Sequence, residues 1–379
     1  MTSLRPDIDP DGLLEYSVVF SDRALNHMSQ KFQRVMREIS QILKQTYNAH
    51  TAIIVPGGGT IGMEAVARQF ATDRRTLAVR NGWFSYRWTQ IFEMGRIASA
   101  NSVLKARPVA PGRQAPFAPP PVDEVVAAIG EQRPDAVFVP HVETASGIML
   151  PESYLRAISE AARSAGAIFV LDCIASGAVW IDMQDIGVDV LVSAPQKGWS
   201  GSPCSGFVML SERARNLMAG IRSTSFATDL NRWLQIMQAY EGGSHAYHST
   251  LPTDALVKTH EAMVETRAYG LEQLRTRQID LGQRVRALLA SKGLRDVAAQ
   301  GYHAPGVVVS YTDDDALHTG KAFVAAGLQA AAGVPLQCDE PADFKTFRIG
   351  LFGLDKLYNV ERTVANLDAV LGRVLTKAR

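Results

Sequence analysis

Short, wholly apolar segments alternate with helical patterns between Thr51 and Leu210. The segments are too short for buried helices, and their neighbours carry the turn residues that bound strands. Strands that are apolar at every position are buried on both faces, and helices between them indicate a mostly parallel sheet covered on both sides. The sequence therefore predicts an α/β fold. The strand candidates are residues 51–55, 76–79, 136–139, 168–171, 188–192 and 206–210.

The pattern changes after about Thr253, where a long helical stretch runs from Glu261 to Leu289. Two strand-like runs, 307–310 and 346–349, and two helical patterns, 316–326 and from 357 onward, follow it. This mixture predicts a smaller C-terminal α+β domain after the large one. The expected division is an N-terminal segment at 1–25, a large domain at 26–262 and a small domain at 263–379.

Composition narrows the class of partner and the compartment. Lys plus Arg number 39 and Asp plus Glu number 38, so the basic excess of a nucleic-acid-binding protein is absent. No window of 18 apolar residues predicts a membrane span, and the first 20 residues lack the apolar run of a signal peptide. Three scattered cysteines with no CxxC pair predict reduced thiols and no metal site. We expect a cytoplasmic protein that binds neither nucleic acid nor membranes.

A glycine cluster, Pro56-Gly-Gly-Gly-Thr60, joins the first strand candidate to a helical pattern. Glycines let the backbone approach an anion closely, and the N–H groups of a helix start bind phosphate. Gly58, Gly59 and Thr60 are therefore candidate phosphate ligands. An ordinary strand-to-helix turn has the same composition, so the cluster alone does not decide the point.

An aspartate and a lysine follow two further strand candidates, at the sheet edge where open α/β folds bind ligands. Asp172 ends the run 168–171, and Lys197 lies 25 residues later in Ser193-Ala-Pro-Gln-Lys197-Gly. A desolvated lysine, or one near another cation, serves as a Schiff-base nucleophile. Taken singly, the aspartate also fits a turn cap and the lysine fits a solvated loop.

The small domain contributes an arginine, Arg348, between the apolar residues of the run 346–349. An arginine so placed either clamps a carboxylate bidentately or forms a structural ion pair. A phosphate cradle, an aspartate, a lysine and a carboxylate-binding arginine are together the parts that a pyridoxal 5'-phosphate enzyme needs. Lys197 would form the aldimine with the cofactor aldehyde, and Asp172 would keep its pyridine nitrogen protonated.

With these motifs the sequence resembles the class V aminotransferases, which include alanine–glyoxylate and serine–pyruvate aminotransferases. The resemblance covers about residues 48–353 and rests on ordered matches to family motifs. The matching segments are Gly57-Gly-Gly-Thr60, Asn81-Gly-Trp-Phe84-Ser-Tyr-Arg, His141-Val-Glu-Thr144-Ala-Ser-Gly147, Val170-Leu-Asp172-Cys-Ile174, Gln196-Lys197, Tyr247-His-Ser-Thr250 and Arg348.

The resemblance implies a role for each matched residue. Phe84 stacks on the cofactor ring, with Trp83 as the adjacent alternative, and Ile174 packs under that ring. Thr144 reaches the cofactor through its hydroxyl, and Gln196 precedes the reactive lysine. Arg348 binds the substrate α-carboxylate. His141 and Glu143 are expected to be structural rather than catalytic.

The resemblance also implies an assembly, a fold and a reaction. Tyr247 and Thr250 reach the phosphate in the neighbouring subunit of a homodimer. The fold is that of fold type I pyridoxal phosphate transferases, with a mostly parallel seven-stranded sheet between helices. The implied reaction transfers an amino group between a small amino acid, of alanine or serine type, and a small 2-oxo acid, of glyoxylate or pyruvate type.

Two segments depart from the family pattern, and two other functions stay open. Residues 12–27 replace the usual Gly-Pro-Thr segment that lines the substrate pocket, and residues 199–206 replace a proline-rich form. A lyase or cysteine desulfurase on the same fold is the main alternative, because Cys338 lies in a loop-like stretch. A desulfurase, however, generally has histidine where this chain has Gln196. A non-catalytic binding protein would be expected to lack Lys197 or Asp172.

Overall fold

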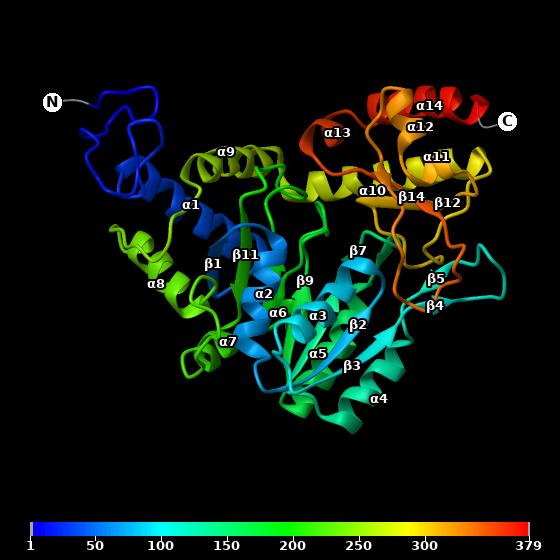
Figure 1. The fold of residues 1–379 in the computed structure, drawn as a ribbon, viewed down its shortest axis with the longest axis horizontal. Helices are drawn as coiled ribbons and strands as arrows, with labels where there is room; N and C mark the ends of the chain where they lie inside the picture. Colours follow the sequence, from blue (N-terminus) through cyan, green and yellow to red (C-terminus); the bar gives the residue numbers. More distant parts are fainter. Residues whose placement is uncertain (1–2, 378–379) are drawn as a thin grey trace.

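The computed structural model describes residues 3–377, and a seven-stranded sheet forms its centre (Figure 1). The strand order is β1-β11-β10-β9-β6-β2-β3. β11 runs antiparallel to both of its neighbours, and the other pairs are parallel. This confirms the predicted mostly parallel sheet. The strands are β1 (Thr51–Pro56), β2 (Arg75–Arg80), β3 (Ala100–Lys105), β6 (Ala136–Pro140), β9 (Ile168–Asp172), β10 (Val190–Ser193) and β11 (Ser205–Leu210).

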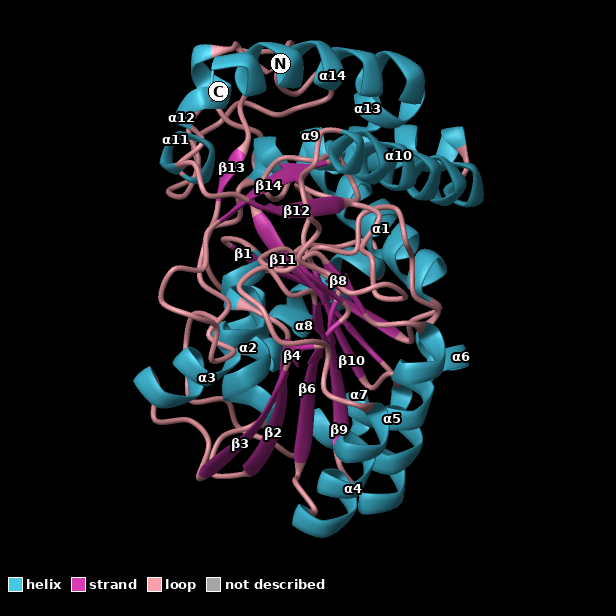
Figure 2. Cartoon of the chain, turned by 90° about the vertical axis from the view of Figure 1, so that its right-hand side faces the viewer, coloured by secondary structure: helices cyan, strands magenta, loops and turns pink. Residues whose placement is uncertain are grey.

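Helices cover both faces of this sheet. Figure 2 shows α2 and α3 on one side and α4, α5 and α6 on the other. Because every central strand is buried along almost its whole length, apolar side chains from both faces enter one continuous core. The helices of this part are α1 (Gln30–Tyr47), α2 (Gly59–Phe70), α3 (Trp83–Met94), α4 (Val122–Gln132), α5 (Glu152–Ala165), α6 (Met183–Ile186), α7 (Glu212–Met218) and α8 (Leu230–Glu241).

The edge strand β3 was absent from the sequence prediction. Its sequence, ANSVLK, has only two large apolar residues, and the strand is half-buried because it pairs on one side alone. The proline-rich stretch 108–121 is held in place at both ends by backbone hydrogen bonds. β4 (Arg107–Pro108) pairs with β5 (Phe117–Ala118), and the Phe117 amide donates to the Val297 carbonyl at 2.7 Å.

The C-terminal part builds a second hydrophobic core on a three-stranded antiparallel sheet, in the order β12-β14-β13. This sheet and its helices lie beyond the carboxyl ends of the large sheet's parallel strands (Figures 1 and 2). The elements are α9 (Thr253–Tyr269), α10 (Leu271–Ser291), β12 (Val307–Tyr311), α11 (Asp315–His318), α12 (Lys321–Ala325), β13 (Ala331–Ala332), β14 (Thr346–Gly350), α13 (Leu354–Tyr358) and α14 (Val360–Lys377).

Two predicted helices are interrupted by glycines. The stretch 261–289 divides between α9 and α10 at Gly270, where φ is +103°, and the pattern 316–326 divides between α11 and α12 at Gly320, where φ is +79°. Residues other than glycine are strained at such angles, so each glycine ends its helix. The expected continuous helices were therefore wrong at these two points.

The N-terminal segment packs against α1 and α9, at the opposite end of the molecule from α14 (Figure 1). The Lys31 ammonium donates to the Ile8 carbonyl at 3.1 Å, and the Leu25 amide donates to Asp254 at 3.0 Å. The predicted domain limits at 25/26 and 262/263 stay predictions. Within residues 3–377, no helix is long and apolar enough to cross a membrane.

Candidate active site

The glycine turn connects β1 to α2 at the sheet edge where the parallel strands end. Gly57 has φ of +119°, a left-handed conformation that favours glycine. Gly58 precedes α2 without capping the helix through a side chain, so the first N–H groups of α2 have no side-chain acceptor there. A Cβ atom on Gly59 would lie 2.7 Å from Cδ1 of Ile174. The turn therefore packs directly against the segment that follows Asp172.

Asp172 ends β9 as a buried carboxylate, 8% exposed. Its Oδ1 accepts a hydrogen bond from the Ile174 amide at 2.9 Å, and its Oδ2 accepts none within residues 3–377. Burial raises the pKa of Asp172 to about 6, and the Glu143 charge adds to this, while Lys197 and Arg87 oppose it. A positively charged donor that hydrogen-bonds to Oδ2 would lower the pKa of Asp172 and satisfy this oxygen.

Lys197 follows β10 in the loop that faces Asp172. Burial lowers the pKa of its ammonium, and the charges of Arg87 and Arg348 lower it further, against the attraction of Asp172 and Glu143. Its Nζ lies 6.0 Å from the ring centroid of Phe352. A lowered pKa increases the fraction of neutral amine, which is the nucleophilic form.

Arg348 reaches the same place from β14 of the small sheet. Its Nε donates to the Ala332 carbonyl at 2.8 Å, and its guanidinium carbon lies 5.3 Å from the ring centroid of Phe84. No carboxylate within residues 3–377 forms an ion pair with it. Burial lowers its pKa from the usual value, although arginine stays charged at neutral pH. The site thus presents an arginine fork that no protein carboxylate occupies.

Glu143, a fully buried carboxylate after β6, connects the segments that carry Phe84 and Thr144. Its Oε2 accepts from the Ser85 amide at 2.8 Å and the Ser85 hydroxyl at 2.7 Å. Its Oε1 accepts from the amides of Ala145, at 2.9 Å, and Phe84, at 3.3 Å. The carboxylate also lies at the α3 N-terminus, where the helix dipole favours negative charge. These contacts support the structural role expected for Glu143.

Replacing Glu143 with glutamine is expected to destabilise the protein by about 2–4 kcal/mol, because an amide nitrogen would face donors that need acceptors. Equilibrium unfolding in urea measures this free energy. Glu93→Gln, an exposed change on α3, the helix whose N-terminus Glu143 contacts, is the control and should cost less than about 0.5 kcal/mol. Equal stability of the two variants would show that the Glu143 contacts contribute nothing.

The structure treats the remaining predicted residues differently. Thr144 is buried beside Glu143, and its hydroxyl makes no hydrogen bond within residues 3–377. Gln196 is exposed next to Lys197. Tyr247, 53% exposed, hydrogen-bonds Thr250 at 3.2 Å and lies against His27, and neither contacts Lys197 in the described part of the chain. The contacts within residues 3–377 thus do not bring this pair to Lys197 in one chain.

Sequence reasoning missed two site residues, Arg87 and Phe352. Arg87 closes the motif that contains Phe84, and its Nη1 donates to the Thr60 hydroxyl at 2.8 Å. Its position in the same motif, three residues after Phe84, was the available signal. Phe352 follows β14 and packs against Gly177 and Gly306, close to Lys197. Only the packing of the two sheets places this ring.

Cys338 does not fit the mobile nucleophile of a desulfurase. It is 3% exposed, and its thiol donates to the Arg80 carbonyl at 3.4 Å. The Glu340 carboxylate accepts three backbone N–H groups of its loop, from Leu336, Gln337 and Cys338, at 2.6–3.0 Å. Burial raises the pKa of the Cys338 thiol to about 12, so the reactive thiolate is scarce.

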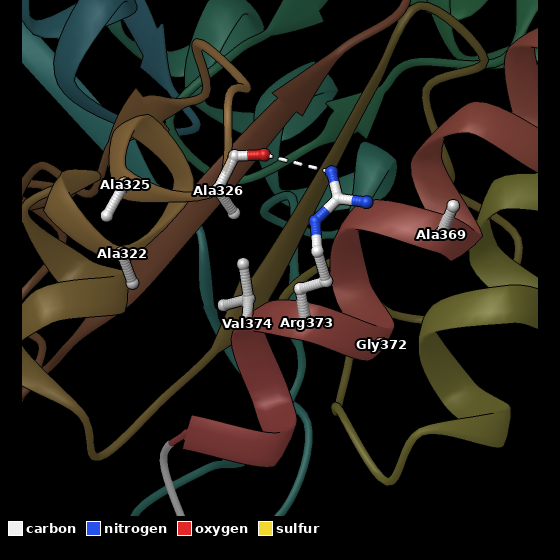
Figure 3. Close-up of a pocket in the computed structure, with 7 residues that line it drawn as sticks. All are labelled: Ala322, Ala325, Ala326, Ala369, Gly372, Arg373 and Val374. Atoms are coloured by element: carbon white, nitrogen blue, oxygen red, sulfur yellow. Dashed lines mark hydrogen bonds between the residues drawn. The ribbon is translucent and has the colours of Figure 1, made fainter.

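A separate cavity of about 580 Å³ lies between α12 and α14 of the small domain (Figure 3). Alanines dominate its lining, and the polar contact drawn there is Arg373 donating to the Ala326 carbonyl at 3.0 Å. It lacks the nucleophile, acid or base that catalysis needs. This cavity is therefore not an alternative to the Lys197 region as the candidate active site.

Comparisons with known proteins identify the family of the chain. The family profile described as Aminotransferase class-V matches residues 13–333. A 2-aminoethylphosphonate–pyruvate transaminase of Vibrio vulnificus is 23% identical over 333 residues, 87% of this chain and 86% of the relative. Alanine–glyoxylate aminotransferase 1 of Saccharomyces cerevisiae is 28% identical over 268 residues, 66% of each chain.

Solved structures show the same fold. An alanine–glyoxylate aminotransferase from Nostoc sp. superimposes with a TM-score of 0.78 at 22% identity, covering 93% of this chain and 89% of that one. A pyridoxamine–pyruvate aminotransferase from Mesorhizobium loti gives a TM-score of 0.76 at 18% identity, covering 94% and 87%. The chain has the fold type I architecture of these enzymes, belongs to the class-V aminotransferase family and is an aminotransferase.

Proposed function

We propose that the protein transfers an amino group between a small amino acid, of alanine or serine type, and a small 2-oxo acid, of glyoxylate or pyruvate type, with pyridoxal 5'-phosphate as cofactor. The observation that carries the proposal is that Asp172 from the large sheet and Arg348 from the small sheet both lie close enough to Lys197 for their charges to act on the pKa of its ammonium. These groups are a nucleophile, an anion and a carboxylate clamp. Amino transfer between carboxylic acids needs all three.

The residues present fit the cofactor. The unsatisfied Oδ2 and raised pKa of Asp172 suit a protonated pyridine nitrogen, and the partly neutral Lys197 suits an aldehyde. The glycine turn at Gly58 and Gly59, with the Thr60 hydroxyl, supplies donors of the kind that hold phosphate. Bound there, the cofactor supplies an electron sink for the carbon that loses its proton.

The residues of this chain then divide the work. Arg348 orients the substrate by its carboxylate, so that the α-carbon faces Lys197. The Nζ of Lys197 takes the α-proton as a general base and later returns a proton as a general acid. Asp172 holds the charge that makes the proton transfer favourable. Phe84 and Ile174 provide apolar surfaces, and Thr144 supplies a free hydroxyl.

The names of the relatives support the proposed amino acceptor, a small 2-oxo acid, more strongly than they support any one amino donor. Pyruvate or glyoxylate appears in the names of several of them, including the Vibrio, yeast, Nostoc and Mesorhizobium enzymes. The amines in those names differ widely. A small 2-oxo acid that pairs with Arg348 is therefore the common requirement. A half-reaction screen tests the donor: protein loaded with cofactor is mixed with single amino acids, and the visible absorbance shows which of them convert the cofactor to its amine form.

Changing Arg348 to alanine is expected to lower kcat/KM for carboxylate substrates by about 10- to 150-fold, the contribution of one charge-assisted pair. Arg348→Lys keeps the charge but loses the fork, so its KM should also rise substantially. Steady-state kinetics with alanine and glyoxylate measure both effects. Unchanged kinetics in Arg348→Ala would place the carboxylate clamp elsewhere.

We also propose a homodimer in which Tyr247 and Thr250 complete the partner's site. Within residues 3–377, Tyr247 is exposed and contacts Thr250 and His27 rather than Lys197, which supports this arrangement. A two-fold interface would complete both sites at once. The exposed apolar side chains of the N-terminal segment, Leu13, Tyr16 and Val18, suit burial in the same interface.

Mixed dimers test the shared site. A dimer of one Lys197→Ala and one Tyr247→Ala protomer would contain one doubly defective site and one intact site, so mixing the two weak or inactive variants should restore activity. If Tyr247 served its own subunit, both sites of the hybrid would be defective. Mixing would then restore no activity. Sedimentation of the wild type at dilute concentration is a second test, and an active monomer there would contradict the shared site.

A further inference from the structure

Arg87 is a second arginine of the site without a carboxylate partner. It lies on α3, and no Asp or Glu within residues 3–377 forms an ion pair with it. Its guanidinium carbon lies 4.7 Å from the ring centroid of Phe84, the same ring that Arg348 approaches. The two guanidinium carbons are thus no further apart than the sum of these two distances. Partly buried arginines without a protein anion are typical of sites that bind an anionic ligand.

A hydrogen bond holds the Arg87 guanidinium next to the Thr60 hydroxyl, so the two groups are adjacent hydrogen-bond donors. The Nη1 of Arg87 donates to the Thr60 Oγ1 at 2.8 Å and occupies a lone pair of that oxygen. The hydroxyl proton of Thr60 then remains to donate to another group. Thr60 lies in the first turn of α2, directly after the glycine turn. The guanidinium and the hydroxyl therefore lie side by side next to the glycine turn.

The carboxylates of the site are used elsewhere, so they do not neutralise Arg87. Glu143 accepts four hydrogen bonds from the α3 start and from the following loop, and Asp172 lies at the end of β9. Arg87 is close enough to lower the pKa values of both Lys197 and Asp172. Its positive charge thus acts on the centre of the site.

We propose that Arg87, together with the Thr60 hydroxyl, binds an anionic oxygen group of a ligand in the Lys197 site. The group is either the phosphate of the cofactor or a second anionic group on the amino donor. The site then holds a ligand at two anionic points, one at Arg348 and one at Arg87. This inference rests on the proposed function and adds to it a residue that sets ligand charge.

The first arm of the test measures cofactor binding rather than turnover. Pyridoxal phosphate and pyridoxal, which lacks the phosphate, are titrated into the cofactor-free full-length protein, followed by absorbance. If Arg87 binds the phosphate, Arg87→Gln should weaken pyridoxal phosphate binding by about 10- to 100-fold more than it weakens pyridoxal binding. The pyridoxal phosphate affinity of Arg87→Lys should lie between those of the wild type and Arg87→Gln. This variant keeps the test decisive if the glutamine variant fails to fold. Arg284→Gln, a surface change on α10, should match the wild type.

The second arm compares alanine with aspartate, which adds one carboxylate, as donors for protein saturated with cofactor. A loss in Arg87→Gln that is confined to aspartate would place the anion on the donor. Thr60→Val, alone and combined with Arg87→Gln, should give non-additive losses because both residues hold one group. The inference is overturned if Arg87→Gln changes neither the ratio of pyridoxal phosphate affinity to pyridoxal affinity nor the ratio of activity with aspartate to activity with alanine. If the wild type binds no pyridoxal phosphate, the proposed function itself fails, and this inference fails with it.

Discussion

Lys197→Ala should abolish turnover, lowering kcat by about 10⁴-fold or more, because one side chain supplies both the nucleophile and the acid–base group. The structure supports this role: among the residues that it describes, Lys197 is the lysine whose pKa burial lowers, and the charges of Asp172, Arg87 and Arg348 act on it. The initial rate of amino transfer measures the loss. Thermal unfolding of the variant should stay near that of the wild type, because the lost ammonium was partly desolvated.

Borohydride reduction of the cofactor-loaded protein, followed by peptide mapping, provides the matching chemical test. The label should be found on the peptide that contains Lys197. Lys258 on α9 and Lys321 on α12 serve as controls, and their alanine variants should retain activity. A label on either of them would overturn the assignment of Lys197.

Asp172→Asn is the second change with a large expected effect and should lower kcat by about 10²–10³-fold, the cost of removing one preorganised charge. Asparagine has nearly the same shape, so the fold and cofactor binding should largely persist while the electron sink weakens. Steady-state kinetics and absorbance titration separate these two quantities. Near-normal turnover in this variant would contradict the role of Asp172.

The same substitution should stabilise the cofactor-free protein at neutral pH. The pKa of Asp172 is raised to about 6 in the folded protein, against about 4 when unfolded. The folded state therefore binds the extra proton between these values, and the stability from this group is present at low pH and lost as the pH rises through 6. Asp172→Asn should unfold at a higher temperature than the wild type at pH 8, with the advantage disappearing near pH 4.

The buried strands of the large sheet could be predicted from the sequence because a strand that is buried on both faces is apolar at every position. The run 168–171 is apolar throughout, and the structure buries all of β9. β3 escaped because an edge strand keeps polar residues on its free side, as ANSVLK does. The breaks at Gly270 and Gly320 escaped because a single glycine is tolerated within many helices, and only its backbone angle decides whether the helix ends.

The candidate site divides in a similar way. Asp172, Lys197 and Arg348 were visible because each charged residue follows or interrupts an apolar run. Arg87 and Phe352 were not, because their importance depends on contacts between segments far apart in the chain: Thr60 for the first, and the Lys197 loop for the second. The four hydrogen bonds that Glu143 accepts likewise form only when β7 (Val142–Glu143) packs against the start of α3.

The most direct test of amino transfer follows the nitrogen atom itself. Protein loaded with pyridoxal phosphate is incubated with ¹⁵N-alanine and glyoxylate, and the products are identified by mass spectrometry. The account predicts ¹⁵N-glycine and pyruvate in equal amounts, with none formed by Lys197→Ala. If a screen of donors and acceptors gave only ¹⁵N-ammonia, or no labelled amino acid for any pair, the protein would be a lyase or a binding protein rather than a transaminase, and the central claim would be wrong.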